Sequence, residues 1–368
     1  MHKRLVAILI AMLSLAATSA QELEWSVDMN AVFNNREGGN YETPAQTFIF
    51  TRITPQIGVS MDSTRHRIMG GVTWYQPMND NLHGYKVLPA LYYEYKNPDE
   101  EIDFKFGVIP NELNAFYPTY LRSDSINYVN PNIKGATIKI SKPHFYFESW
   151  LDWRQIMTKH RREAFSVAGS IGWRNSEYAN DGGNDICIGS NLAFNHLARS
   201  GARPDGEGVV DNVIINPSIV YTHWWHNASF SAEARMLLSC DRDRVSDNKW
   251  LTQAGFLGGV SGHWKWLSLA EFIYAGKRQM PLYEKYGSLL YQGDQFFHNK
   301  FYSSTIVAAT IFNTDYLIVQ ARLSFHATDK TTAFWQQLAV RFYLDRNLWG
   351  KYKKKERRLY YSPLHPQF

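Results

Sequence analysis

Histidine and serine side chains are the groups in this sequence whose types and spacing could support catalysis or metal binding. The motif THWWH at 222–226 brings two imidazoles together, but no nearby carboxylate or cysteine completes a zinc ligand set. Ser324 and His326 are two residues apart, as a nucleophile and its base could be, yet such pairs are common on any polar strand face. The segment GGVSG at 258–262 lacks the strand-to-helix context of a nucleophile elbow. From motifs alone we expect no catalytic residue, no metal site and no cofactor.

Alternation of apolar and polar residues is the pattern that must position any functional side chain. In FYFESWLDWR at 145–154, the odd-numbered positions are apolar except for a serine, and the even-numbered positions carry all the charges. Successive side chains of a strand point to opposite faces, so this segment predicts a strand with one apolar and one charged face. The same period returns in ITPQIGV at 53–59 and in LIVQARLSFH at 317–326.

Runs of this alternation, broken at Gly, Pro, Asn and Asp clusters, predict about 16 strands. They are expected near 23–33, 47–61, 65–75, 86–95, 101–109, 135–140, 144–154, 163–174, 185–195, 211–222, 225–238, 250–261, 264–275, 301–312, 315–326 and 333–344. Long and short links alternate along most of the chain, as outer loops and periplasmic turns do in membrane barrels. Two links, 175–184 and 327–332, depart from this rule and could each mark a miscounted strand.

The two ends of the chain differ from the alternating pattern. Residues 1–20 have a basic start, an apolar run and small residues at the end, which predicts a signal peptide cleaved near Ala20. No later apolar run reaches the length of about 20 residues that a membrane-crossing helix needs. The net charge of +5 comes mostly from the lysines and arginines of 351–358, so it is no argument for binding nucleic acid. We expect 345–368 to be a basic periplasmic tail.

The apolar faces indicate which kind of β-protein this is. They include small residues such as Gly169, Gly258 and Ala232, and aromatic residues gather near strand ends. Lipid contact suits such a face better than the interdigitated core of a soluble sandwich does. The predicted fold is therefore all-β, a transmembrane antiparallel up-and-down β-barrel over 21–344. Two alternatives stay open: a barrel enzyme that acts on lipid, and a secreted soluble β-protein that binds glycans.

The charged faces of these strands would line the lumen. A water-filled pore uses such charges to select solutes, whereas in a narrow barrel they pair across strands and fill the interior. About 16 strands enclose more space than side chains fill, which favours a pore, and a small excess of cations predicts weak anion preference. The candidate pore-lining residues are Arg52, Arg67, Lys105, Lys139, Glu148, Asp152, Arg154, Arg174, Glu233, Arg235, Arg322 and Arg341, with Asp28, Glu94, Asp103, Lys265 and Glu271 expected on the same face.

In its strands and links the chain after residue 20 resembles the porin-type barrels of Gram-negative outer membranes. FGVIPNEL at 106–113 and DSINYVNPNIKGATIKI at 124–140 resemble a passage of uncharacterised porins of Bacteroidetes, whose pattern favours Tyr-Arg-Pro-Asn-Ile-Glu-Gly. Asn130 and Lys134 replace the arginine and glutamate of that pattern, so no role of those two residues is carried over.

This resemblance implies a function, a location and partners. It implies an outer-membrane pore, not an enzyme, for passive diffusion of small hydrophilic solutes, reached after secretion through the inner membrane. The implied partners are outer-membrane lipid, lipopolysaccharide and the barrel-assembly machinery, with the oligomeric state left open. In general porins the link after the fifth strand folds into the lumen as a constriction, and 110–134 has that place here. Its candidates for solute contact are Glu112, Tyr117, Tyr120, Arg122 and Asp124; the alternative is a cap exposed to the medium.

Overall fold

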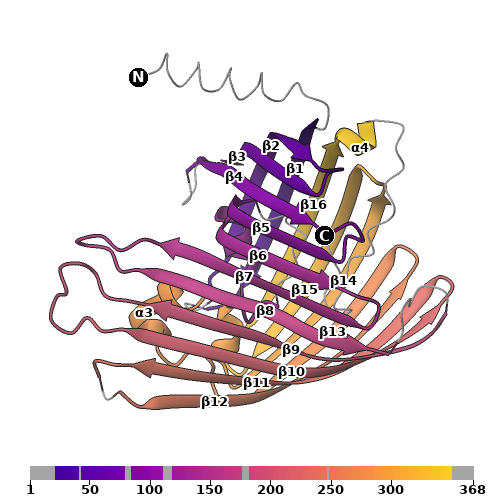
Figure 1. The fold of residues 1–368 in the computed structure, drawn as a ribbon. Helices are drawn as coiled ribbons and strands as arrows, with labels where there is room; N and C mark the ends of the chain where they lie inside the picture. Colours follow the sequence, from indigo (N-terminus) through magenta and orange to yellow (C-terminus); the bar gives the residue numbers. More distant parts are fainter. Residues whose placement is uncertain are drawn as a thin grey trace.

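Sixteen antiparallel strands close into one barrel in the part of the chain that the structure describes (Figure 1). The structure is a computed structural model and describes residues 21–40, 43–78, 84–110, 118–175, 182–246 and 248–349. Each strand pairs with its neighbours in sequence, and β1 pairs with β16 to close the sheet. This order confirms the predicted fold class and strand number. Closure leaves no strand edge with unpaired backbone groups, as a bilayer requires.

The strands vary in length from 8 residues in β5 to 17 in β1. Their bounds are β1 Glu22–Gly38, β2 Gln46–Met61, β3 His66–Pro77, β4 Lys86–Lys96, β5 Ile102–Ile109, β6 Ile133–Ser141, β7 Phe145–Gln155, β8 Ala164–Arg174, β9 Gly183–Leu197, β10 Val210–Trp225, β11 Ala228–Asp243, β12 Trp250–Trp264, β13 Leu267–Gly276, β14 Phe301–Asn313, β15 Leu317–Thr328 and β16 Thr332–Asp345.

The two links that departed from the expected alternation do not change the strand order. β8 pairs directly with β9, and β15 pairs directly with β16. The β15–β16 link is a tight turn in which the backbone N–H of Thr328 donates to the carbonyl oxygen of Thr331 at 2.8 Å. This outer link is simply short.

Apolar side chains cover the outer face of the barrel. On β9, Ile186, Ile188 and Leu192 are 38%, 53% and 45% exposed, whereas Asn191 and Ala193 at inward positions are buried. Neighbouring strands repeat this pattern, which gives the continuous apolar belt that a bilayer covers.

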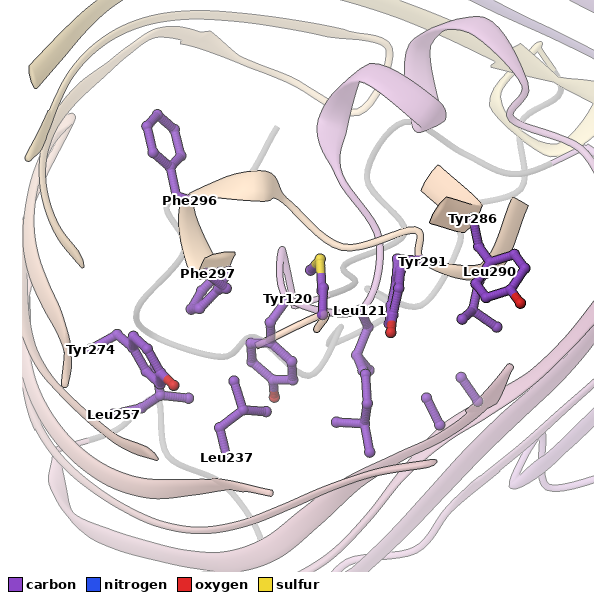
Figure 2. Packing of buried hydrophobic residues seen from close by; sticks show 14 of the residues in the cluster. Tyr120, Leu121, Leu237, Leu257, Tyr274, Tyr286, Leu290, Tyr291, Phe296 and Phe297 are labelled. Atoms are coloured by element: carbon purple, nitrogen blue, oxygen red, sulfur yellow. The ribbon is translucent and has the colours of Figure 1, made fainter. Parts of the chain in front are cut away.

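Two of the outer links fold back into the barrel. The β5–β6 link contributes residues 118–132 with α2 (Asp124–Val129), and the β13–β14 link contributes residues 277–300 with α3 (Tyr283–Leu290) and η1 (Gln295–His298). Figure 2 shows their apolar side chains meeting inward residues of the wall. No helix among the described residues is long and apolar enough to cross a membrane.

The inward segments share an apolar core with the wall. Phe296 and Phe297 of η1 are 1% and 0% exposed, and the Phe297 ring centroid lies 5.6 Å from that of Tyr274 on β13. Leu257 of β12 belongs to the same cluster (Figure 2). Burying each side chain of this size contributes about 1.5–3 kcal/mol, so the inward position of the β13–β14 segment is stabilised chiefly by its aromatic residues.

Backbone hydrogen bonds join the two inward segments to each other. The N–H of Ser123 donates to the carbonyl oxygen of Gln292 at 2.8 Å, and the N–H of Asp294 donates to that of Thr119 at 2.7 Å. Two segments about 170 residues apart in sequence are thus packed as one unit inside the barrel.

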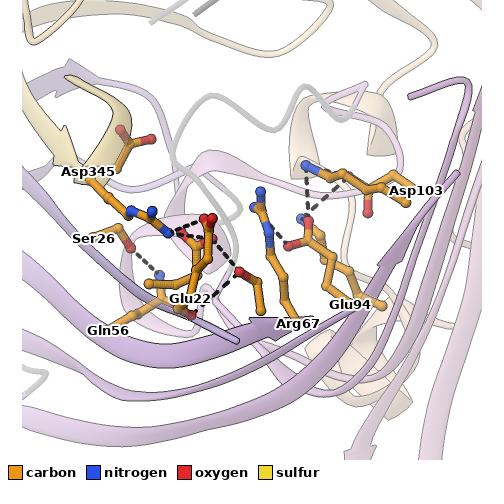
Figure 3. A network of polar contacts seen from close by, with 12 residues as sticks. Glu22, Ser26, Gln56, Arg67, Glu94, Asp103 and Asp345 are labelled. Carbon is orange, nitrogen blue, oxygen red and sulfur yellow. Dashed lines mark hydrogen bonds and ion pairs between the residues drawn. The ribbon is translucent and has the colours of Figure 1, made fainter. Parts of the chain in front are cut away.

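Ion pairs join the start of β1 to the first residue after β16 (Figure 3). Arg346, the first residue of α4 (Arg346–Trp349), lies 2.5 Å from Glu22 and 3.8 Å from Glu24. Glu24 also accepts a hydrogen bond from the Ser60 hydroxyl at 2.8 Å. The predicted signal peptide 1–20 lies outside the described residues, as do residues 350–368 of the predicted tail.

Arginine on the lipid-facing side should destabilise the barrel more than arginine on the lumen side. Val167 is 38% exposed on the outer face of β8, and Ser170 faces the lumen opposite Glu148. Val167→Arg should lower the free energy of unfolding by roughly 2–4 kcal/mol, whereas the guanidinium in Ser170→Arg can pair with Glu148. Urea unfolding in lipid vesicles measures both values, and equal losses would contradict the assigned faces.

Docking of the β13–β14 segment should weaken as the pH rises from about 4 to about 6. Burial raises the pKa of Asp294 from 3.8 to about 6, so in this range the folded state holds a proton that the unfolded segment has released. The contribution is therefore complete below about pH 4 and lost above about pH 6, and amounts to at most about 3 kcal/mol. Amide hydrogen exchange in residues 277–300 measures it.

The matched control for this effect is the exposed Asp315. Asp294→Asn should reduce the pH dependence of protection in 277–300, and Asp315→Asn in the exposed β14–β15 turn should leave it intact. An unchanged pH dependence in Asp294→Asn would assign the effect to another group.

Candidate functional site

All twelve wall residues predicted to line a pore lie at inward positions of their strands. Near the periplasmic end, Glu94 accepts from three cations (Figure 3): its carboxylate lies 3.4 Å from Arg67, 3.2 Å from Lys96 and 3.4 Å from Lys105. Asp103 lies 3.8 Å from Lys105. These charges form a network across β3, β4 and β5, and their role in solute passage stays a prediction.

Several other wall charges are also paired within the wall. These pairs are Arg341 with Asp28 at 3.0 Å, Arg235 with Glu233 at 2.6 Å, and Arg174 with Asp185. Lys139 lies directly opposite Glu148 in the register of β6 and β7, and Arg322 donates to the Ser324 hydroxyl at 3.1 Å. In each of these pairs the opposite charge of the partner compensates the side chain, so these groups do not each need contact with bulk water.

Three predicted wall residues hold the inward segments. Arg52 donates to the carbonyl oxygen of Asn127 at 3.0 Å, and Arg154 donates to that of Leu289 at 2.8 Å. Asp152 pairs with Arg122 at 3.3 Å, and both side chains are almost fully buried. These contacts tie the β5–β6 segment to β2 and β7 and the β13–β14 segment to β7, so the inward segments are built into the barrel.

The predicted constriction residues that the structure describes lie inside the barrel. The Tyr120 hydroxyl donates to Asn216 and accepts from the Asn191 amide at 2.7 Å, and burial raises the pKa of Tyr120 above its usual value. Arg122 donates to the Asn127 side chain at 2.7 Å. Asp124 begins α2. Glu112 and Tyr117 lie outside the described residues.

Tyr128 is a lumen residue that the sequence analysis missed. Its hydroxyl accepts from Asn34 at 3.1 Å and from Gln337 at 2.7 Å, and burial raises its pKa to about 12. Phe48 and Phe50 of β2 pack around its ring, with centroids at 5.6 Å and 5.2 Å. These phenylalanines sit at polar-face positions of β2, which was the available signal that something apolar packs inside.

Two residues expected in the lumen lie elsewhere, which corrects the sequence analysis. Lys265 lies in the β12–β13 turn with a φ of +52°, one residue after β12 ends. Glu271 faces outward on β13 and accepts a hydrogen bond from Thr305. The reason is that Phe272 and Tyr274 take the inward positions of β13, where they pack against the inward β13–β14 segment.

Ser324 and His326, which share a strand face, make contacts with different groups. Ser324 accepts from Arg322 at 3.1 Å, whereas the His326 ring lies between Phe296 at 4.7 Å and Trp335 at 4.2 Å. His326 Nδ1 is 2.9 Å from the Tyr302 hydroxyl. Both side chains are buried among the inward segments, where a membrane lipid does not reach.

A histidine and an aspartate meet on the outer face, at the outer end of the barrel. His196 is next to last in β9 and Asp211 is second in β10, and the register places them directly opposite each other. His196 Nδ1 lies 2.7 Å from Asp211 Oδ1, and Asp211 is only 3% exposed. Both share the strand face of the exposed Leu192 and Ile215, so this dyad faces the membrane side.

An arginine and a row of aromatic rings frame the dyad. Arg244 donates to Asp211 Oδ2 from Nε at 3.0 Å and from Nη2 at 2.6 Å. The Phe165 ring centroid is 4.9 Å from that of His196, and Trp153 stacks on Phe165 at 5.1 Å. The imidazole therefore has an apolar surface beside it and a fixed carboxylate behind it.

The dyad lies at the outer edge of the apolar belt. On β9 His196 follows Leu192 by four residues, and on β10 Asp211 precedes Ile215 by four, about 13 Å along each strand. A bilayer that covers the belt has its hydrocarbon boundary near this level.

The geometry of the dyad suits general base catalysis. A carboxylate that accepts a hydrogen bond from Nδ1–H fixes the tautomer of the imidazole. Nε2 is then left without a proton and can act as the base. In the described part of the chain no serine or threonine hydroxyl is hydrogen-bonded to His196. The arrangement therefore suits activation of a water molecule more directly than activation of a side-chain nucleophile.

The sequence held a signal for this dyad that motif reasoning did not use. The predicted link 196–210 placed His196 and Asp211 at the two ends of one hairpin loop, which makes them neighbours in space. Both continue the apolar face of their strands, where a charged or titratable residue is unusual. A search for local motifs passes over this pair, because the residues are 15 apart.

Among solved structures, an OmpT loop-deletion variant from Vibrio cholerae has a TM-score of 0.51 at 10% identity, covering 89% of this chain and 100% of that chain. OpdK of Pseudomonas aeruginosa with vanillate has a TM-score of 0.47 at 9% identity, covering 88% of this chain and 99% of that chain. At such identities the first likeness shows an outer-membrane barrel fold and nothing more. No curated protein matches the chain.

A family model described as lipid A 3'-O-deacylase-type matches residues 15–349. The expectation that the chain is not an enzyme is wrong, because this is a family of enzymes. The expectation failed because no contiguous motif in the sequence marks a catalytic group. The specific resemblance to porins of Bacteroidetes is not shown by these comparisons. With a match over nearly its whole length, the chain belongs to the lipid A 3'-O-deacylase-type family.

Proposed function

We propose that this protein is an outer-membrane esterase that hydrolyses an ester-linked acyl chain of lipid A or a similar acylated glycolipid. The observation that carries the proposal is the His196–Asp211 dyad on the outer face, at the edge of the apolar belt. A site there is reached by membrane lipid and not by solutes in the lumen. The substrate class is supported by the family to which the chain belongs.

The aromatic row beside the dyad would hold the acyl chain. Trp153 and Phe165 present stacked rings that lead toward the imidazole, and Trp153 is 40% exposed. An acyl chain that lies along these rings keeps its apolar contacts while its ester group reaches His196. Binding along the row would orient the ester before reaction, which is a large part of what an active site supplies.

Hydrolysis at this dyad needs one water molecule. As the water oxygen attacks the ester carbonyl carbon, His196 Nε2 takes the water proton, and Asp211 stabilises the imidazolium that forms. The tetrahedral intermediate then breaks its bond to the alcohol oxygen, and this oxygen takes the former water proton from the imidazolium. The products are a free fatty acid and the deacylated alcohol.

Arg244 contributes positive charge to the same site. It is held against Asp211 by two hydrogen bonds, while its side chain is 47% exposed. A fixed cation beside the reacting ester favours the negative charge that develops on the carbonyl oxygen, more strongly where lipid excludes water. We therefore assign Arg244 an electrostatic role in addition to positioning Asp211.

Removing either member of the dyad should abolish most of the hydrolysis while the barrel stays folded. His196→Gln and Asp211→Asn should each lower the rate by about 10²–10⁴-fold, the usual range for loss of a general base. Fatty acid released from purified lipid A in mixed micelles, measured by mass spectrometry, gives the rate. Heat-dependent gel mobility shows whether each variant is folded.

The matched control is another outward-facing histidine, His223, which lies on β10. His223 Nδ1 donates to the Asn184 side-chain oxygen at 2.7 Å, but this histidine lies at the periplasmic end of the barrel. His223→Gln should keep the wild-type rate. Undiminished release of fatty acid by His196→Gln would show that the reaction takes place elsewhere.

Passive passage of solutes is a second candidate function. The observation that favours it is the charge network near the periplasmic end, where the Asp103 and Lys105 side chains are 22% and 26% exposed inside the wall. These groups can contact water and small ions there. The inward segments restrict the outer half of the lumen, so the conductance would be small.

Reconstituted protein should then show weak anion preference in planar bilayers. Lys139→Gln combined with Arg322→Gln should shift the reversal potential toward cations, because both cations face the lumen and their contacts are with the wall. The shift should shrink as salt rises, since exposed charges are screened over about 8–10 Å near physiological ionic strength. Lys265→Gln in the turn is the control, and cation preference in the unmodified protein would contradict the assignment.

A further inference from the structure

The outer links above the dyad carry an exposed basic surface. The exposed cations of the β7–β8, β9–β10 and β11–β12 links are Lys159, Arg161, Arg199, Arg203, Arg244 and Lys249. Among the described residues of these links, the exposed acid is Asp205. We call the group formed by Lys159, Arg161, Arg199 and Arg203 the basic ledge.

Backbone hydrogen bonds fix the two links of the basic ledge against each other. The N–H of Gly201 donates to the carbonyl oxygen of Thr158 at 2.8 Å, and the N–H of Ala202 donates to that of Lys159 at 2.9 Å. Nearer the barrel, the N–H of Ala198 donates to the carbonyl oxygen of Glu163 at 2.8 Å. The two links of the ledge thus stay hydrogen-bonded to each other beyond the outer ends of β8 and β9.

Apart from the exposed Asp205, the acids near the ledge are bound to other groups. Glu207 accepts from the Ser200 N–H at 2.9 Å and hydroxyl at 2.7 Å, and it lies 3.7 Å from Arg162. Asp211 is held by His196 and Arg244. The four exposed cations of the ledge therefore outnumber its single exposed acid among the described residues, which leaves a net positive surface.

We propose that the basic ledge binds phosphate on the headgroup of the substrate, so that the enzyme selects an anionic, phosphate-bearing glycolipid. This inference rests on the proposed esterase function. Arg199 follows His196 by three residues, about 10 Å along the chain, which leaves room for sugar rings between a bound phosphate and an ester at the imidazole. Arginine suits phosphate because its planar fork makes paired, charge-assisted hydrogen bonds.

Binding can be measured apart from turnover. Full-length protein carrying Asp211→Asn is mixed with vesicles of neutral phospholipid that contain lipid A, either phosphorylated or enzymatically dephosphorylated. Adding Arg199→Gln and Arg203→Gln should weaken binding of the phosphorylated form by about 25-fold at low salt, about fivefold for each cation. Binding of the dephosphorylated form should not change, and the difference should shrink as salt rises.

Kinetics in the unblocked enzyme give a second measurement. With Arg199→Gln and Arg203→Gln, KM for phosphorylated lipid A should rise while kcat stays near the wild-type value, because the ledge does not touch the reacting atoms. Lys330→Gln is the matched control. It removes an exposed cation from the β15–β16 turn, on the same outer end but seven strands away from β8.

Each other outcome overturns the inference in a distinct way. Equal weakening for both forms of lipid A would show that the ledge supports the fold only, and no weakening would show that phosphate binds elsewhere. Equal weakening on vesicles of anionic phospholipid without glycolipid would make the ledge a general contact with charged membranes. If no glycolipid is hydrolysed at all, the esterase proposal fails, while the phosphate dependence of binding is still decided by the turnover-blocked protein.

Discussion

Complete pairing of backbone hydrogen bonds is the constraint on which the rest of this structure depends. A bilayer offers no partner for a free N–H or carbonyl group, so a sheet inside it must close on itself. Closure fixes the register, and the register fixes which side chains are neighbours. Asp28 meets Arg341 in the lumen, and His196 meets Asp211 on the membrane side, because the strands that carry them are bonded in those registers.

The same closure separates the molecule into two chemical environments. Inside, Tyr128, Phe296 and the buried Arg122–Asp152 pair fill the outer half with folded chain. Outside, the surface is apolar up to a rim where charged and titratable groups begin. The proposed esterase site is on the outside of the barrel, so the folded chain in the lumen does not obstruct access to the dyad.

The alternation of side chains was enough to predict the barrel, its strand number and the inward position of the wall charges. Misplacement of Glu271 had a physical cause: the lumen positions of β13 are aromatic because a distant segment packs on them, and alternation cannot tell an apolar lumen from lipid. For the same reason, alternation did not show that Phe48 and Phe50 face the lumen and pack against Tyr128. The dyad was missed for another reason. His196 and Asp211 become a pair only across a hairpin, so their chemistry depends on pairing between strands and not on neighbours in sequence.

The pairing of β1 with β16 constrains the order in which the strands of the barrel can assemble. Hairpins such as β10 with β11 join residues close in sequence, whereas Asp28 lies opposite Tyr343, more than 300 residues away. Local hairpins can form early, but the longest loop in the molecule closes only when the last strand arrives. Until then β1 and β15 both keep an unpaired edge, which lipid does not tolerate and which other strands can capture. The ion pairs of Arg346 with Glu22 and Glu24 join β1 to the residue that follows β16, so they form together with the pairing that removes both open edges.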